Sequence, residues 1–430
     1  MPAPRPPLSK QSFILAAVSA LAGLGLGVVL TLQFTPAPPP VSAPPPQEEE
    51  APPSPPVAVV YDEVVHSDLP GWSSDSLIEA LPALKRSCGR FERMGAEETI
   101  GTGQIERTAA AWSAACAALD GANDNESLRA VLDSHFTAYS ISDTSKETAP
   151  DLGTFTGYYE ADIKGSLTRT GPYQTPIYGP PRDLVTVNLK DFISNTSAFD
   201  LGVPDSLVGR VEPGARGGLF RSYYTREDID SSGAIANEAD VVVWADDPVD
   251  VHILHIQGSG RVVLPDGHVI RIGFAGHNGH SFRGIGGILL RAGELKPGQG
   301  SMISVRKWLQ AHPQKAEAYM NQNARYIFFR RLNPSETESG PIGALGVSLT
   351  PQRSLAVDPR FVPLGAPVWI DASDPDGIPL QRLMSAQDIG SAIKGPVRGD
   401  FFWGHGEEAF SKAGRMKSDG RLFVLVPKLV

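Results

Sequence analysis

The stretch "VHILHIQGSGRVVLPDGHVIRIGFAG", residues 251–276, decides the fold class of this chain. Short runs rich in Val and Ile alternate with Gly, Pro and Asp, which is the pattern of short strands joined by tight turns. Asp266 and Gly267 stand between two apolar runs, a strong signal for a β-hairpin. In this interpretation His252 and His255 lie in a strand, and their side chains point to opposite faces.

The same pattern of short apolar runs and turn residues extends from Gly153 to the C-terminus, as in "FTGYYEADI" at 155–163 and "DVVVWADD" at 240–247. One helical segment interrupts it at 301–323, and residues 73 to about 138 have helical apolar spacing, with a third helix beginning at Asp124 or Asn125. We therefore predict a mainly β body with an N-terminal helical preface, built from barrels rather than from a parallel α/β sheet.

Composition narrows the function classes. The chain has 430 residues, enough for two domains, and its 41% hydrophobic and 20% charged residues are typical of a globular protein. A formal charge of −10, with no basic run, argues against nucleic acid or anionic lipid as the main partner.

The N-terminus predicts a membrane anchor. Arg5 and Lys10 precede an apolar run at 13–34 that would reach ~33 Å as a helix, enough to cross a bilayer. We expect residues 1–12 to be cytoplasmic, 13–34 to span the membrane and the Pro-rich residues 35–59 to form a spacer. The alternative is a cleaved signal ending at "VSA", 41–43, although Pro44 opposes cleavage there. In both cases the remaining chain is exported.

The two cysteines, Cys88 and Cys116, lie in the predicted helical preface. An even pair in an exported chain suggests one disulfide joining two helices. Two buried free thiols are the alternative.

Neither a metal site nor a cofactor site is predicted. His277 and His280 share the sequence "HNGH", but no nearby cysteine or carboxylate completes a zinc set. Ser391 and Lys394 fit the S-x-x-K pattern of penicillin-binding acyl enzymes, whose companion motifs are absent. Gln257 and Ser259, between glycines in "IQGSGRV", are suited to bind sugar hydroxyls, although a simple β-bulge would explain the same pattern.

Three aspartates are candidates for acid chemistry. Asp358, Asp388 and Asp400 each stand at the end of a predicted strand beside Gly or Pro, where aspartate is also a favoured turn residue. In "AQDIGSAIKGPVRGDFFWG", 386–404, Asp400 runs into three aromatic residues, so ionising it is costly if the site is dry. Arg398, two residues earlier, would lower the same pKa if it faced the carboxylate.

The sequence resembles the membrane-bound lytic murein transglycosylase A family from about Gly153 to Lys428, and the preface with paired cysteines resembles that of some members. The resemblance rests on eight motifs in the family's order: "FTGYYEADI", "TPIYGPP", "YYTREDI", "HIQGSG", "GFAGHNGHSFRGIG", "ALGVSLTPQRSLAVDPRFVPLGAPVWI", "QDIGSAIKGPVRGDFFWG" and "AGRMKSDGRLFVLVPK".

This resemblance implies a fold and a function. It implies a double-psi β-barrel formed by residues 60–158 and 282–430, an inserted second β-domain at 159–281, and a cleft between them that holds glycan. The expected activity is periplasmic cleavage of the β-1,4 bond between N-acetylmuramic acid and N-acetylglucosamine in peptidoglycan, leaving a 1,6-anhydro-muramoyl end, without a cofactor or metal.

The resemblance also assigns residues. Asp400 matches the single catalytic acid and base, with Asp388 and Asp358 as supporting carboxylates. The expected glycan contacts are Gln257, Ser259, Gly260, Tyr158, His277 and Asn278. The sequence departs from the family at Ser391, where a glycine is usual, and at His277, where a lysine can stand; the lipid-attachment cysteine of some relatives is absent, and residues 13–34 would replace it as anchor.

Two other classes compete with this interpretation. A peptidoglycan-binding barrel without activity would share the fold, but it has no need of the acid. A two-aspartate protease would need a D-[ST]-G pair in two halves, and the sequence contains none.

Overall fold

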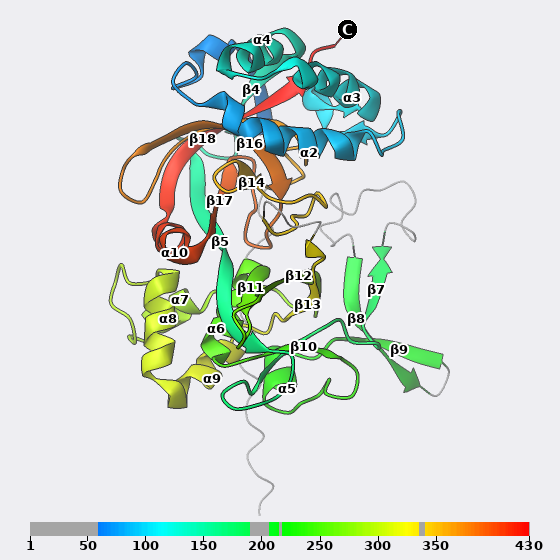
Figure 1. Cartoon of the computed structure of the whole chain (residues 1–430), viewed down its shortest axis with the longest axis vertical. Helices are drawn as coiled ribbons and strands as arrows, with labels where there is room; N and C mark the ends of the chain where they lie inside the picture. Colours follow the sequence, from blue (N-terminus) through cyan, green and yellow to red (C-terminus); the bar gives the residue numbers. More distant parts are fainter. Residues whose placement is uncertain (1–58, 190–205, 215–216, 335–339, 430) are drawn as a thin grey trace, which may run out of the picture. The chain divides into compact units, whose positions relative to one another are not determined.

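The computed structural model describes residues 59–189, 206–214, 217–334 and 340–429 (Figure 1). The predicted cytoplasmic N-terminus, the predicted membrane span at 13–34 and all but the last residue of the spacer at 35–59 lie outside these ranges. Within the described ranges, none of the helices has the length and hydropathy needed to span a bilayer.

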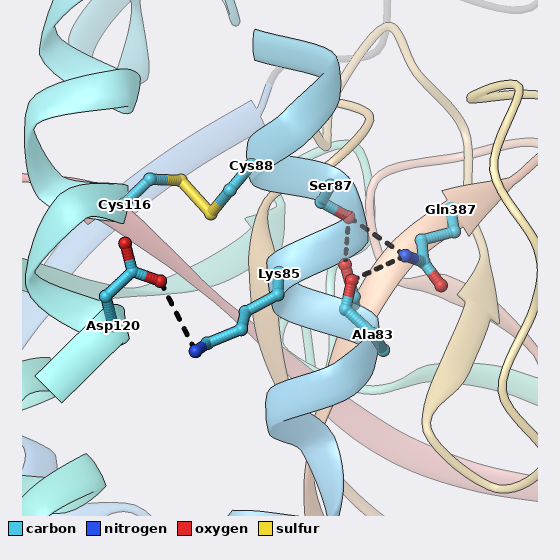
Figure 2. Close-up of a disulfide and its surroundings, with 8 residues drawn as sticks. Ala83, Lys85, Ser87, Cys88, Cys116, Asp120 and Gln387 are labelled. Atoms are coloured by element: carbon cyan, nitrogen blue, oxygen red, sulfur yellow. Dashed lines mark hydrogen bonds and ion pairs between the residues drawn. A yellow bond between two sulfur atoms is a disulfide. The ribbon is translucent and has the colours of Figure 1, made fainter. Parts of the chain in front are cut away.

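The helical preface forms as the sequence predicts. Its helices are α2 (Leu81–Phe91), α3 (Ala109–Ala117) and α4 (Asn125–His135), and between α2 and α3 lies a short ribbon of β2 (Thr99–Ile100) and β3 (Arg107–Thr108). Asp124 caps α4 by accepting a hydrogen bond from the backbone N–H of Ser127. Cys88 on α2 and Cys116 on α3 form a disulfide with an S–S distance of 2.03 Å (Figure 2).

Helix α2 is also attached to the sheet. The side-chain amide of Gln387, the residue before Asp388, donates to the carbonyl of Ala83 and to Ser87 Oγ, both on α2 (Figure 2). Gln387 is fully buried and also accepts a hydrogen bond from Ser354 Oγ. The stapled preface therefore supports the strand that ends at Asp388.

The described strands form one 13-stranded sheet, a three-stranded sheet and the two-stranded ribbon of the preface. The main sheet runs in the order β1-β4-β18-β15-β16-β14-β17-β5-β11-β12-β13, with β10 paired to β5 and β6. Its strands are β1 (Val59–Val64), β4 (Phe136–Asp143), β5 (Gly153–Ser166), β6 (Thr175–Tyr178), β10 (Val241–Ala245), β11 (Ser259–Val263), β12 (Val269–His277), β13 (Ile327–Arg331), β14 (Ser354–Ala356), β15 (Pro367–Ser373), β16 (Pro379–Asp388), β17 (Arg398–His405) and β18 (Lys417–Pro427). The three-stranded sheet contains β7 (Val185–Asn188), β8 (Ser206–Gly214) and β9 (Gly217–Ser222).

Strand β5 connects two hydrophobic cores. Its first half pairs with β17 and β18, and its second half pairs with β11 and β10. Phe155 packs into the core formed by the preface and the C-terminal strands, whereas Tyr159 and Ala161 pack into a second core with β11 and β12. Since side chains alternate along a strand, Thr156 and Tyr158 face the opposite side of β5.

The predicted hairpin at Asp266–Gly267 is confirmed, because β11 and β12 pair antiparallel across it. The prediction that His252 and His255 lie in a strand is wrong: both are on helix α6 (Pro248–Gln257). Asp247 caps this helix, Pro248 occupies its first turn and Gly258 ends it with a φ of 79°. These three signals at the ends of the segment favour a helix, although its many β-branched residues favour a strand.

The other helices are α5 (Arg226–Asp230), α7 (Ile285–Arg291), α8 (Met302–Ala311), α9 (Pro313–Asn321) and α10 (Gly406–Arg415). The single helix predicted at 301–323 is two helices, because Pro313 cannot continue α8 and begins α9 instead. The sequence did not predict α5, α7 or α10. The prediction of a mainly β fold is confirmed; the double-psi barrel, the domain boundaries and the cleft stay predictions.

Candidate active site

Strand pairing brings two of the three candidate aspartates to one place. Ala356 on β14 lies opposite Asp388 of β16 on one side and opposite Asp400 of β17 on the other. Asp400 in turn lies opposite Thr156 of β5. Residues more than 200 positions apart in the sequence therefore meet on four adjacent strands.

Asp400 is half-buried, and its carboxylate accepts a 2.5 Å hydrogen bond from Thr156 Oγ1. Burial raises the pKa of Asp400 to about 6, against the lowering effects of the Thr156 hydrogen bond and the Arg398 charge; the charge of Asp388 adds to the increase. A carboxyl group with this pKa holds its proton over a useful fraction of molecules near neutral pH.

Arg398 is linked to Asp400 through Thr156, and its charge also lowers the pKa of Asp400 directly. Its guanidinium donates to Thr156 Oγ1 at 2.8 Å and to the carbonyl oxygens of Thr154 and Gly399. The hydroxyl of Thr156 accepts from the cation and donates to the acid, so it fixes the carboxyl orientation. The cation therefore lowers the pKa of Asp400 less than burial raises it.

Asp388 has hydrogen-bond partners that carry no charge. The Tyr158 hydroxyl donates to Oδ2 at 3.0 Å, and the backbone N–H groups of Ala344 and Ile389 donate to Oδ1 at 2.9 and 3.0 Å. Burial raises the pKa of Asp388 to about 6, and these three hydrogen bonds limit the increase. Tyr158 is thus part of the site, held against Phe402 with ring centroids 5.1 Å apart.

Asp358 has a different environment. It is fully buried, and Arg360 donates to both of its oxygens, with Nε 2.9 Å from Oδ1 and Nη2 2.5 Å from Oδ2. The backbone N–H of Gly395 donates to Oδ2 at 2.8 Å. Burial alone would raise the pKa of Asp358, but Arg360 and the backbone donors together hold it below its ordinary value. Asp358 therefore anchors the loop between β16 and β17.

The aromatic residues after Asp400 divide between two faces. Phe401 is buried in the main core, whereas Phe402 packs with Tyr158 and Ala356 on the face that carries Asp400. Ser391, in the loop between β16 and β17, is exposed. Among the described non-glycine residues, positive φ values occur at Ala149 and Gln352, so Ser391 carries no left-handed backbone strain.

Gln257, Ser259 and Gly260 lie where α6 ends and β11 begins. Gln257 Oε1 accepts a hydrogen bond from the backbone N–H of Tyr159 at 3.0 Å, and a Cβ on Gly260 would lie 2.5 Å from Leu254 Cδ1. Ser259 is buried. These contacts join α6 and β11 to β5, and the predicted sugar contacts of the three residues stay predictions.

The residues predicted from the "HNGH" loop are also engaged within the protein. Asn278 is 1% exposed; its amide donates to the carbonyls of Tyr224 and Ala324, and its oxygen accepts from the N–H of Tyr326. This geometry does not favour the predicted glycan contact of Asn278. His277 Nδ1 accepts from the N–H of Gly279, and burial lowers the pKa of His277 to about 4, so its ring is neutral near pH 7.

Sequence reasoning missed Thr156. Its one signal was its position two residues before Tyr158 in a predicted strand, which puts both side chains on one face. As for metals, no cluster of three or more His, Cys, Asp or Glu side chains suited to an ion occurs within the described ranges.

Two protein-family models match the two segments of the chain that carry the residues of this site. The model of the MltA specific insert domain matches residues 154–330, which include Thr156 and Tyr158, and the model of the 3D domain matches residues 353–426, which include all three aspartates. A crystal structure of MltA from Neisseria gonorrhoeae is 32% identical with a TM-score of 0.70, covering 86% of this chain and 94% of that chain. The chain belongs to the MltA family.

Other MltA relatives agree. A crystal structure of membrane-bound lytic murein transglycosylase from Agrobacterium tumefaciens is 32% identical with a TM-score of 0.71, covering 85% of this chain and 97% of that chain. The curated membrane-bound lytic murein transglycosylase A of Escherichia coli (strain K12) is 30% identical over 280 residues. That match covers 63% of this chain and 65% of the length of the E. coli protein.

Proposed function

We propose that this chain is a peptidoglycan lytic transglycosylase that cleaves the β-1,4 bond between N-acetylmuramic acid and N-acetylglucosamine. The observation that carries the proposal is Asp400, a half-buried carboxyl whose pKa lies at about 6 and whose hydrogen bond comes from a neutral hydroxyl. Membership of the MltA family supplies the substrate class, because the relatives are named murein transglycosylases.

The reaction needs one acid that later serves as a base. Protonated Asp400 donates its proton to the glycosidic oxygen as the bond to C1 of the muramoyl residue breaks and positive charge develops on the ring. The C6 hydroxyl of the same residue then attacks C1, and the carboxylate of Asp400 takes the hydroxyl proton. The product is a 1,6-anhydro-muramoyl end, and the proton balance of the enzyme is restored.

The neighbours of Asp400 position it. Thr156 holds one carboxyl oxygen, which directs the acid toward a single bond of the substrate. Asp388 adds a like charge that raises the pKa of Asp400, and Tyr158 holds Asp388 in place. In this account Asp358 maintains the loop and takes no part in proton transfer.

We also propose that residues 60–158 and 282–430 form a double-psi β-barrel and that residues 159–281 form an inserted β-domain. Glycan would lie in a cleft between them. The additional pairing of β18 with β5 supports a barrel, because it joins two strands that are already linked through β15, β16, β14 and β17. The insert-domain match covers residues 154–330, so it contains the whole proposed insertion and extends past both of its ends.

We place the enzyme in the bacterial cell envelope, facing the periplasm and anchored by residues 13–34. Glycan contacts are proposed at Tyr158 and at the Gln257–Gly260 segment, where the end of α6 and the start of β11 contact β5.

Mass spectrometry of digested murein sacculi tests this function. The full chain should release muropeptides with 1,6-anhydro-muramoyl ends, Asp400→Asn should release none, and Asp120→Asn, which alters an 80% exposed carboxylate on the preface, should act like the unaltered chain. Products with reducing muramoyl ends would indicate hydrolysis instead. Binding of sacculi without any released product would favour a non-catalytic peptidoglycan-binding module.

A further inference from the structure

A cavity lies within the matched insert-domain region, apart from the candidate active site. It has a volume of about 690 Å³ and is enclosed by residues of β6, α5, α6, α8 and α9. This volume falls in the range of roughly 300–1,000 Å³ that is usual for small-molecule sites. None of its lining residues contacts Asp388 or Asp400 through the hydrogen bonds described above.

His252 on α6 lines this cavity in an unusual state. The residue is 1% exposed, and neither imidazole nitrogen has a hydrogen-bond partner among the described residues. Burial and the nearby charge of Arg226 lower the pKa of His252 well below its ordinary value, so the ring is neutral and has one donor and one acceptor nitrogen. Buried polar groups are nearly always hydrogen-bonded, so this ring indicates a ligand with a complementary polar group.

The charges on the wall favour a cation. Asp230, Asp247 and Glu317 face the cavity, and Arg226 is the one basic residue among those that line it in the described structure. The guanidinium of Arg226 is directed largely into the protein, with hydrogen bonds to the carbonyls of Asn323 and Arg325 and to His255 Nδ1. Its contact with Asp230 is long, at 3.4 Å, and the Asp230 side chain remains 38% exposed, so a ligand has access to it. Burial raises the pKa of Asp230, and the neighbouring Arg226 and Tyr326 oppose that rise, as a bound cation would.

The rest of the wall is apolar. Val251, Leu309 and Met320 are buried residues from three different helices that line the same cavity. They provide a surface for an alkyl chain, and the acidic residues provide the partner for a charged end.

We propose that this cavity binds the primary ammonium group of an aliphatic amine, with the ammonium donating to Asp230 and to the acceptor nitrogen of His252 and the alkyl chain packing on Val251, Leu309 and Met320. Two sources share this chemistry, a free alkyl diamine and the side-chain amine of a peptide. The inference goes beyond the cleavage reaction and does not depend on it.

Isothermal titration calorimetry of the full chain tests the site with two probes, 1,5-diaminopentane and a short peptide that carries one lysine. Binding of the diamine alone assigns a free amine, and binding of the peptide assigns a peptide amine. Asp230→Asn should weaken the binding by about tenfold or more, since it removes a charge-assisted hydrogen bond. Glu227→Gln, a neutralisation on the same helix α5 but outside the cavity, should leave the affinity unchanged.

Absence of binding of both probes to the unaltered chain would overturn the proposal, as would equal affinity in Asp230→Asn. If Asp230→Asn fails to fold, Glu317→Gln on α9 provides a second variant with the same expected loss. Cleavage of murein should be unchanged in these variants, so a failure here is distinguishable from a failure of the proposed enzymatic function.

Discussion

Two different carboxylate environments lie between residues 358 and 400. The first contains Asp400 and Asp388, and the second contains Asp358 and its partner Arg360. In the first, two half-buried carboxyls accept hydrogen bonds from Thr156, Tyr158 and backbone N–H groups, and burial raises both pKa values to about 6. In the second, a guanidinium binds both oxygens of a fully buried carboxylate, and the pKa falls.

The difference shows that burial alone does not decide the protonation state of an aspartate. Asp358 is the least exposed of the three, yet it is the one whose pKa is lowered, because Arg360 and Gly395 compensate the lost hydration. An acid that must hold its proton needs neutral donors. We therefore assign proton transfer to the first environment and loop anchoring to the second.

The largest contrast between the two environments should be in catalysis. Asp400→Asn should lower the rate of murein cleavage by about 10²–10⁴-fold, the usual contribution of a general acid, while the chain stays folded. Asp358→Asn should retain most of the activity of each folded molecule. Release of anhydro-muropeptides, normalised to the folded fraction from circular dichroism, measures both; equal losses in the two variants would remove the distinction.

The next contrast should be in stability. Asp358→Asn should lower the free energy of unfolding by about 1–3 kcal/mol, because it leaves Arg360 and a buried backbone donor without their charged partner. The exposed pair of Asp151 and Arg421 provides a matched control, since Asp151→Asn should cost only about 0–1 kcal/mol. Urea unfolding measures both values, and a cost for Asp358→Asn no greater than the control would contradict an anchoring role.

The sequence predicts the environment of Asp358 better than it predicts the environment of Asp400. The three aspartates and their family match were predictable, and Arg360, only two residues from Asp358, was a local signal for an ion pair. Thr156 was not predictable as the partner of Asp400, because 244 positions separate them and only the parallel pairing of β5 with β17 brings them together. Local patterns also predicted the fold unevenly. The alternating residues and the Asp-Gly turn correctly predicted the hairpin. A short apolar helix such as α6 has the composition of a strand, and only its end residues distinguish it.

The pH dependence of stability should have opposite signs in the two environments. A raised pKa, as at Asp388 and Asp400, gives a contribution to stability that is complete below the pKa of the unfolded chain and is lost as the pH rises through about 6. A lowered pKa, as at Asp358, gives a contribution that is present above the unfolded pKa and is lost as the pH falls through the folded value.

Relative to the unaltered chain, Asp388→Asn should therefore gain stability between about pH 4 and pH 8, by roughly 1–2 kcal/mol after solvent screening of a half-buried group. Asp358→Asn should lose stability over the same comparison or show no change. Thermal or urea unfolding at the two pH values provides the measurement, and slopes of the same sign in both variants would show that the two environments are alike.

The smallest expected effect concerns Thr156. Because its hydrogen bond lowers the pKa of Asp400, Thr156→Val should move the alkaline limb of the pH–rate profile to higher pH, and it should lower the maximal rate by about 3–10-fold through loss of orientation. Thr154→Val, on the same strand, is the control, since Thr154 contacts Arg398 through its backbone carbonyl. An unchanged alkaline limb in Thr156→Val would mean that Thr156 does not act on the acid.

The most direct measurement is a carboxyl ¹³C NMR titration of the chain labelled at aspartate, with signals assigned by Asp400→Asn, Asp388→Asn and Asp358→Asn. The account predicts that Asp400 and Asp388 titrate at about 6 and that Asp358 titrates below its ordinary range. An Asp400 carboxyl that titrates at or below its ordinary value, together with Asp358, would contradict the assignment of Asp400 as the proton donor.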